Sequence, residues 1–350
     1  MRNKVPVVLA PRWTKNDLWK KAKAVPSLDL RFADSKSLVD ATTGQNLVTF
    51  TRASEATFVN SQGQIQTAAI NAPRFDHNPT TGESLGLLVE EQRQNLLLNS
   101  GTLSTQNVTV TAVAHTLSFT GTGTITLSGT STAGPLVGTG TGEANRVSLT
   151  FTPTAGTLTL TVSGTVTNAQ LEIGAFRTSY IPTAGTAVTR SADVASISGS
   201  NFSSWYRQDE GTMFADCDNA RPVSGGNQFA FRASDGTYTN NVVLNIQSSG
   251  FASLSTAAAG VFDGIATTAT GFSANVQSRM AGAYRSNDLA CCFAGGALAT
   301  DATVTIPSAL TRADIGSDHA GLNRFGSGHI RRLTYWGKRL GNEVLQRITQ

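Results

Sequence analysis

The acidic residues are the first candidates for chemistry in this 350-residue chain. Hydrolysis of a glycosidic bond needs two carboxylates that face each other across one cleft. Asp216 and Asp218 are two positions apart and would share a face of a strand, but they fall where a strand is expected to become a turn. Glu90 and Glu91 are adjacent and would point to opposite faces. We therefore predict no catalytic residues and no enzyme.

Metal, cofactor and nucleophile sites are also not predicted. The sequence contains no His-Glu-x-x-His motif and no phosphate-binding loop. Asp216 with Asp218, or Asp314 with Asp318, could offer oxygen ligands to calcium, but acidic residues on surface turns are commoner. The cysteines, an isolated Cys217 and the adjacent Cys291 and Cys292, form a poor disulfide framework, so we expect them to be small apolar fillers.

Aromatic residues in the last third of the chain are candidates for sugar binding. The C–H face of a sugar packs on an exposed aromatic ring that has polar neighbours. Trp205, Tyr206 and Tyr238 are the possible glycan contacts. Burial in a core is the alternative for each of them, and the sequence does not separate the two.

Arginines recur beside acidic residues in the first hundred positions. The arginines are Arg52, Arg74 and Arg93, and the acids near them are Glu55, Asp76, Glu90 and Glu91. We expect ion pairs between stacked hairpins here in preference to ligand contacts, with Arg52 and Glu55 holding the register.

The composition predicts an all-β protein. Charged residues make up 14% of the chain and Gly, Ser, Thr and Ala dominate, which suits sheets joined by tight turns. No apolar run approaches the roughly 20 residues that span a bilayer, and Pro6 and Pro11 interrupt the only apolar segment near the N-terminus. We expect assembly in a cytoplasm, with no membrane partner.

Residues 1–26 form a predicted N-terminal anchoring arm. They contain seven basic residues and one acidic residue, so they carry the positive net charge of the chain. We expect an extended segment, then a short helix that ends at Pro26 and orders on a partner in preference to its own body. Protein docking is favoured over nucleic acid, through Arg12, Trp13, Leu18, Trp19, Lys20 and Lys21.

The rest of the chain is predicted to form β-sheets in two parts. Residues 27–195 form a hairpin module, with a Gly63 turn, into which a Thr/Gly-rich β-sandwich is inserted between Gly101 and Gln170. Residues 196–350 form a second, jelly-roll sandwich that ends in a short helix carrying Leu345 and Ile348. Phe119 and Phe151 are the only aromatics of the inserted segment, which argues against glycan binding by it.

Several phrases of the module resemble, in order and spacing, a module of tailed-bacteriophage virion proteins of the fibre, spike or decoration type. The phrases, within residues 28–195, are RASEAT, APRFDHNPTTGESLGLLVEEQRQNLLLNS and AQLEIGAFRTSYIPT…AVTRSADV. Residues 196–350, with AYRSNDLACCFAGG and FGSGHIRRLTYWGKRLGNEVLQRIT, resemble the concanavalin-like (laminin-G-like) sandwich that often follows it.

This resemblance implies a non-enzymatic structural component of a phage virion. The chain would be a short fibre or surface appendage, assembled in the bacterial host cytoplasm and docked by its arm to portal, adaptor, tail or capsid proteins. A homotrimer is expected. The alternative is a receptor-binding lectin that recognises a host surface glycan, and a polysaccharide depolymerase ranks last.

Overall fold

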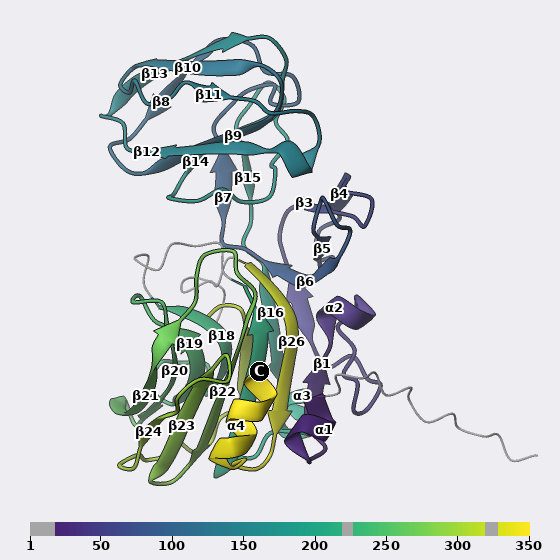
Figure 1. Ribbon diagram of the computed structural model, residues 1–350, viewed down its shortest axis with the longest axis vertical. Coiled ribbons are helices and arrows are strands. Elements are labelled where there is room, and N and C mark those ends of the chain that lie inside the picture. The colour runs from purple at the N-terminus through teal and green to yellow at the C-terminus, as the bar shows by residue number, and fades with distance from the viewer. Residues whose placement is uncertain (1–17, 219–226, 319–327) are drawn as a thin grey trace, which may run out of the picture.

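The computed structural model describes residues 18–218, 227–318 and 328–350. In this part of the chain, a large β-sandwich carries a small β-sandwich at one end of an elongated molecule (Figure 1). Nearly all the regular structure is β, in antiparallel sheets, which confirms the all-β prediction with two sandwiches. The docking residues Arg12 and Trp13 lie outside the described residues.

The first sheet of the large sandwich has eight strands. Its order is β24 (Ala299–Asp301), β23 (Asp288–Phe293), β22 (Ser278–Arg285), β17 (Glu210–Cys217), β26 (Gly328–Trp336), β6 (Ser84–Val89) and β5 (Phe75–His77), with β1 (Leu28–Leu30) also paired to β26. The long strand β26 therefore joins segments from both ends of the chain, because its first half pairs with β6 and its second half with β1.

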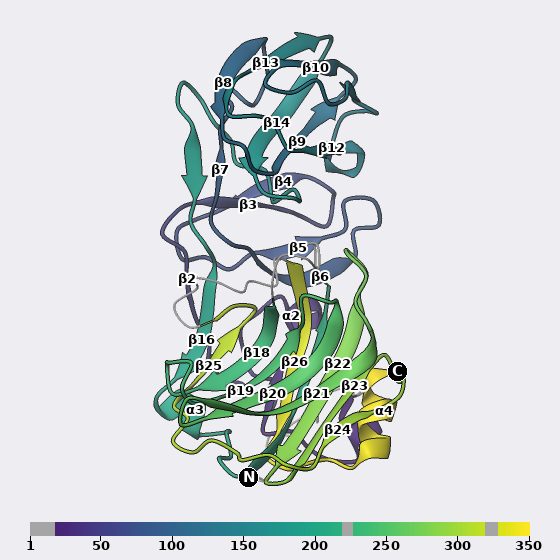
Figure 2. The ribbon, with the colours of Figure 1, turned by 90° about the vertical axis from the view of Figure 1, so that its left-hand side faces the viewer.

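The second sheet has seven strands and packs face to face on the first (Figure 2). Its order is β2 (Thr49–Thr51), β16 (Val194–Ser198), β25 (Arg312–Ile315), β18 (Gln228–Ser234), β19 (Asn241–Ile246), β20 (Phe251–Ala258) and β21 (Val261–Gly271). The core between the sheets contains Leu30 and Phe50 from the hairpin module together with Leu254 and Tyr335. Alternating apolar residues in these strands supply that core, as the sequence pattern predicts.

The expected boundary between residues 195 and 196 falls inside strand β16, and both sheets cross it. Strands β1, β2, β5 and β6 come from residues 28–89, yet they pair with strands of residues 194–336. The large sandwich thus requires both parts of the chain. The hairpin pattern identified these strands, but strand pairing between distant segments leaves no signal in the local sequence.

The small sandwich is inserted between strands β7 (Arg93–Asn95) and β15 (Val188–Arg190), which pair with each other and form a two-stranded neck. One sheet has the order β11 (Leu136–Val137), β10 (Thr124–Gly129), β13 (Gly156–Ser163) and β8 (Gln106–Val110). The other has the order β12 (Val147–Phe151), β9 (His115–Gly121) and β14 (Val166–Ile173), with the short helix η1 (Glu143–Asn145) before β12. Leu117, Ile125 and Leu160 are completely buried in its own core.

A separate hairpin of β3 (Ala56–Val59) and β4 (Ile65–Ala68) projects beside the junction of the two sandwiches (Figure 1). Its turn closes with a 2.9 Å hydrogen bond from the Gly63 amide to Asn60 O. Gly63 has a φ of +74°, and an added Cβ would lie 2.5 Å from Pro79 O. Glycine is required there for both reasons, which confirms the predicted turn.

The helices are short and lie on the large sandwich. They are α1 (Leu18–Ala22), α2 (Phe32–Ser35), α3 (Ser200–Ser203) and α4 (Asn342–Thr349). Leu345 and Ile348 of α4 are fully buried, as predicted from the spacing of apolar residues. None of the helices in the described residues has the length and apolar character needed to cross a membrane.

Candidate functional site

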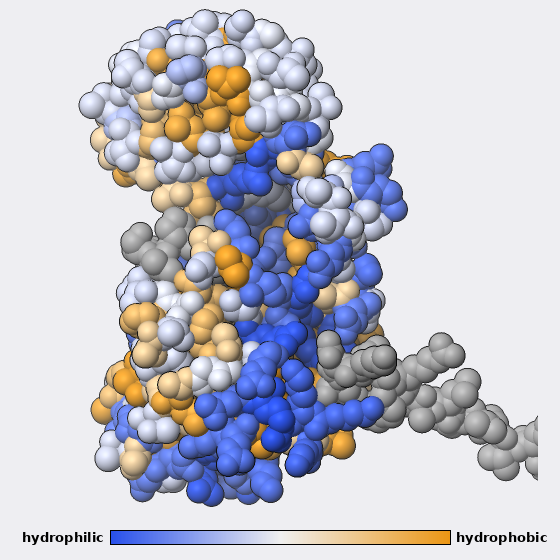
Figure 3. Space-filling view, viewed as in Figure 1, coloured by the Kyte–Doolittle hydropathy of each residue, from blue (hydrophilic) through white to orange (hydrophobic). Residues whose placement is uncertain are grey.

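A cleft of about 440 Å³ lies where the small sandwich, the β3–β4 hairpin and the large sandwich meet. Its lining includes Thr57 and Ile65 of the hairpin, residues 175–180 of the loop after β14, and His329 of β26. Hydrophilic side chains dominate the surface around this junction (Figure 3). Domain junctions are a preferred location of ligand sites, so the cleft is the candidate binding site.

A buried network of charged side chains lies below the cleft. Asp193 pairs with Arg52, at 3.1 Å, and with Arg74, while Glu90 lies 2.8 Å from Arg74 and 3.5 Å from Arg190. All five side chains are at most 6% exposed. The network joins β6 and the neck strand β15 to the loops that flank β2 and β5, so it fixes the small sandwich on the large one.

Glu90 and Arg74 of this network are charged at neutral pH. Burial alone would raise the pKa of Glu90, but Arg190, Arg74 and hydrogen bonds from Ser179 hold it below its usual range. Burial alone would lower the pKa of Arg74, but Asp193 and Glu90 raise it. Charges removed from water persist only when they are paired and hydrogen-bonded in this way.

The ion pairing expected for the module arginines is confirmed, but the partner of Arg52 is different. Glu55 is exposed, and Arg52 pairs instead with Asp193. The guanidinium of Arg52 also donates to the main-chain oxygens of Ser54, Ala69 and Ala72, at 2.8–3.0 Å. It therefore holds the chain before and after the β3–β4 hairpin. Glu55, which is close to Arg52 in the sequence, is not its partner, because the partner Asp193 lies far along the chain, after strand β15.

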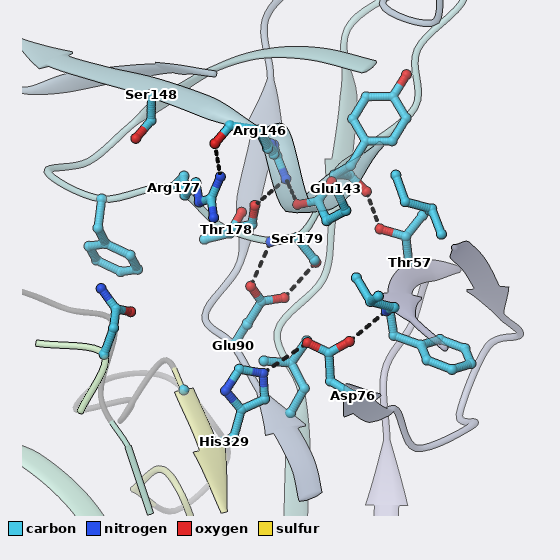
Figure 4. A pocket seen from close by; sticks show the side chains of 18 of the residues that line it. Thr57, Asp76, Glu90, Glu143, Arg146, Ser148, Arg177, Thr178, Ser179 and His329 are labelled. Carbon is cyan, nitrogen blue, oxygen red and sulfur yellow. Dashed lines mark hydrogen bonds and ion pairs between the residues drawn. The ribbon is translucent and has the colours of Figure 1, made fainter. Parts of the chain in front are cut away.

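His329 forms a bridge in the lower wall of the cleft (Figure 4). Its Nε2 lies 2.9 Å from Oδ2 of Asp76, and its Nδ1 lies 2.9 Å from Oδ2 of Asp218. Burial alone would lower the pKa of His329, but the two carboxylates raise it to about 10. The imidazolium therefore donates from both nitrogens and ties β26 to β5 and to the end of β17.

The upper wall of the cleft is cationic. Arg146 lies 3.2 Å from Glu143 and donates to Thr178 O and to Ser118 Oγ, at 3.2 and 2.9 Å. Arg177 donates from Nη1 to Arg146 O at 2.8 Å, and both Arg177 and Ser148 line the wall opposite His329 (Figure 4). These groups can bind an anionic or hydroxyl-rich ligand through charge-assisted hydrogen bonds.

The predicted docking residues of α1 lie against the protein's own body. Leu18 is 5% exposed and packs with Trp336, Leu345 and Ile348, so the helix does not need a partner for its order. Trp19 Nε1 donates to Asp29 at 2.8 Å, and Lys21 Nζ donates to Gln350 O at 3.0 Å. Lys20 is exposed. The preference for a partner was wrong for Leu18, because the apolar face of α4 covers it.

Two of the three predicted glycan contacts are core residues. Trp205 and Tyr206 are 5% and 8% exposed, and they pack with Phe202, Phe231 and Tyr335 between the sheets. They cannot form an exposed platform, so this prediction was wrong for them.

Tyr238 differs from these two, because it is 45% exposed. Its ring centroid lies 5.0 Å from the guanidinium of Arg232, and its hydroxyl donates to Asp318. It lies in the β18–β19 turn and does not line the junction cleft.

The carboxylates weighed as catalytic or calcium ligands are paired with other side chains. Asp216 lies 3.1 Å from Arg279, Asp218 binds His329, and Asp314 pairs with Arg312. Within residues 18–218, 227–318 and 328–350, no three His, Cys, Asp or Glu side chains are grouped as a metal site.

Cys217, Cys291 and Cys292 are free, buried thiols, as predicted.

Arg146 and Arg177 of the cleft were not predicted as site residues. A signal existed for Arg146, since only it and Glu143 are charged within the long Thr/Gly-rich stretch.

The fold and cleft define a two-sandwich β protein with a charged junction. Comparisons with protein-family models and with curated proteins found no match. Several solved structures are similar in backbone fold to part of this chain, less than half of it in each case.

Three solved structures illustrate this similarity. The CBM40 module of the Ruminococcus gnavus IT-sialidase, bound to α2,3-sialyllactose, has a TM-score of 0.36 and 15% identity over 41% of this chain and 83% of that chain. The K499G mutant of Streptococcus pneumoniae NanB sialidase has a TM-score of 0.37 and 12% identity over 43% and 26%. A SAP-like pentraxin from Limulus polyphemus has a TM-score of 0.32 and 11% identity over 40% and 70%. The similarity is confined to backbone shape.

Proposed function

We propose that this chain is a non-enzymatic structural component of a tailed-phage virion, a short fibre or surface appendage assembled in the bacterial host cytoplasm. The observation that carries the proposal is the buried charge network. Arg52, Arg74, Glu90, Arg190 and Asp193 belong to the phrases that resemble phage virion modules, and they come together in one cluster. These phrases therefore have a mechanical purpose, which is to hold two sandwiches in a fixed orientation.

The chemistry of the acids supports a non-enzymatic function. The carboxylates that line the cleft, Asp76, Glu90 and Glu143, each pair with a cation. A general acid needs a raised pKa, and burial does raise the pKa of Glu172, but Glu172 is fully buried and lies outside the cleft lining. Incubation with host polysaccharide tests this point. We expect no new reducing ends, and sustained product would establish a depolymerase.

We further propose that residues 1–17, with Arg12 and Trp13, dock the chain to portal, adaptor, tail or capsid proteins. Leu18, Ala22 and Pro26 are buried, so a deletion of residues 1–26 would damage the body itself. The informative variant lacks residues 2–17 and keeps α1. We expect it to fold and to be missing from particles, and normal incorporation would refute docking by this arm.

The proposal includes a homotrimer. The last strand of the second sheet, β21, carries Val261 and Phe262, which are 62% and 63% exposed, and assembly would remove such an apolar pair from water. Light scattering on the purified chain measures the mass directly. A mass of three chains agrees with the proposal, and a monomer at micromolar concentration contradicts it.

A receptor-binding lectin is the second candidate, and the exposed ring of Tyr238 favours it. The test must use the whole chain, because residues 196–350 alone lack β1, β2, β5 and β6. Binding of a host glycan that Tyr238→Ala abolishes, with unchanged thermal unfolding, would support a lectin site at the β18–β19 turn. Retained binding in this variant would exclude that site.

A further inference from the structure

One wall of the junction cleft carries a cation that no acidic side chain of the described residues contacts directly. Within residues 18–218, 227–318 and 328–350, Arg177 makes a single hydrogen bond, from Nη1 to Arg146 O at 2.8 Å, and no ion pair. Its side chain is exposed, so its other N–H groups can reach a ligand. A guanidinium has five N–H donors in a planar fork that matches a carboxylate.

Two acids, Glu143 and Glu172, act on Arg177 without pairing with it inside the described part of the chain. The acids nearest in influence already have partners, because Glu143 pairs with Arg146 and Glu172 accepts hydrogen bonds from Thr178 and Gln170. Arg177 has an exposed surface, yet the protein atoms packed around its guanidinium displace water and, with the neighbouring Arg146, lower its pKa, while Glu143 and Glu172 offset this only in part. An anion bound at this wall would relieve the repulsion between the two arginines.

Neutral polar groups and an aromatic ring complete the cleft. The hydroxyl of Ser148 and the amide of Asn275 line it, and neither side chain makes a hydrogen bond within the described residues. Phe176 also lines the cleft, and Arg93 holds its ring with a guanidinium 4.7 Å from the ring centroid. Hydroxyl and amide groups both donate and accept, which suits sugar hydroxyls, and a ring suits the C–H face of a pyranose.

We propose that this cleft binds an acidic saccharide, with its carboxylate on Arg177 and its hydroxyls on Ser148 and Asn275. The volume of about 440 Å³ falls in the range of small-molecule sites, which is roughly 300–1,000 Å³. The site does not depend on a virion setting and is separate from Tyr238. The sequence argued against glycan binding by the inserted segment because that segment has few aromatic residues. In the proposed site the aromatic ring is Phe176, which comes from the loop after β14 and not from the strands of the small sandwich.

Isothermal titration calorimetry with trigalacturonate on the whole chain tests the proposal. Three probes separate the sources of affinity: trigalacturonate, its fully methyl-esterified form, which lacks the charge, and triglutamate, which has the charge without the sugar. We expect binding of trigalacturonate alone. No binding at about 10 mM, where even millimolar affinity is measurable, would overturn the proposal. Equal binding of the ester or of triglutamate would overturn it as well.

Variants locate the site. Arg177→Gln should weaken binding by about tenfold or more, since a charge-assisted hydrogen bond is lost. Asn275→Asp should also weaken it, because a second negative charge would face the ligand. Arg285→Gln is the matched control, since Arg285 is exposed and pairs with Asp288 at the opposite end of β22 from the cleft. Unchanged affinity in both cleft variants, with unchanged thermal unfolding, would refute the site whether or not the chain belongs to a virion.

Discussion

The guanidinium of Arg52 lies 3.1 Å from Oδ1 of Asp193, although 141 positions separate the two residues. The other carboxylate oxygen of Asp193 accepts from Arg74 and also from the Glu90 amide, at 2.9 Å. One buried carboxylate thus connects the hairpin region, β6 and the strand that leaves the small sandwich. The relative position of the two sandwiches depends on this connection.

Replacement of the central acid should destabilise the protein strongly. In Asp193→Asn, Arg52 and Arg74 remain buried with less negative charge to neutralise them, and breaking a buried pair costs about 3–5 kcal/mol. Urea unfolding measures the free energy of unfolding. Arg285→Ala removes an exposed pair and should change this free energy by less than about 1 kcal/mol. Equal effects of the two substitutions would contradict a structural function of the network.

The His329 bridge predicts a loss of stability at alkaline pH. Its pKa in the folded protein, about 10, lies above the ordinary value of 6.5, so its contribution is complete below pH 6.5 and disappears as the pH rises through 10. The side chain is 18% exposed, and we therefore expect a modest loss, on the order of 2 kcal/mol.

Urea unfolding of the wild type and His329→Gln at pH 6, 8 and 10 tests this bridge. The difference between the two proteins should shrink as the pH rises, because glutamine does not titrate. Parallel pH curves would show that His329 carries no extra proton in the folded state. The low pKa of Asp218 adds a loss only in acid, below the range of this experiment.

Trp205 and Tyr238 should respond differently to truncation. Trp205 is 5% exposed and packs on Phe202, Phe231 and Tyr335, so Trp205→Ala should cost about 3–5 kcal/mol of stability. Tyr238 is 45% exposed, and Tyr238→Ala should cost much less. Thermal unfolding of the two variants side by side gives the comparison, and a larger shift for Tyr238 would contradict the packing described.

The thiols should be inert in the folded protein. Burial raises the pKa of Cys217, Cys291 and Cys292, so little thiolate forms near neutral pH. Ellman's reagent should detect almost no reactive thiol in native protein and all three in concentrated guanidinium. Fast reaction of the native protein would show that at least one cysteine is accessible.

The sequence predicted local structure well where apolar alternation is regular. All eight strands expected after residue 196 are present, and the strand of Ile125 and Leu127 was correctly assigned to the small sandwich. Strand β21 was missed because its outward side chains, among them Phe262, are apolar, so the alternation of buried and polar residues is lost. The partner of Arg52 was missed because only the fold brings Asp193 near it.

The candidate site was harder to predict than the strands. Its walls come from segments far apart in the sequence that meet only after both sandwiches are formed, and its residue types are ordinary. Asp29 illustrates the same limit, since it stands between the apolar residues Leu28 and Leu30 in the sequence. In the structure it is fully buried and accepts hydrogen bonds from Trp19, Arg332 and Thr334. A local pattern does not reveal a cation supplied from 303 positions away.

The two-stranded neck has a consequence for how such proteins can diversify. Asn95 and Val188 are direct partners in the neck, so the segment between them starts and ends at the same place. That segment has its own core and meets the rest of the chain through few strands. It can therefore be exchanged as a cassette, by recombination or by design, provided that the graft keeps Ser179, which bonds to Arg74 and Glu90.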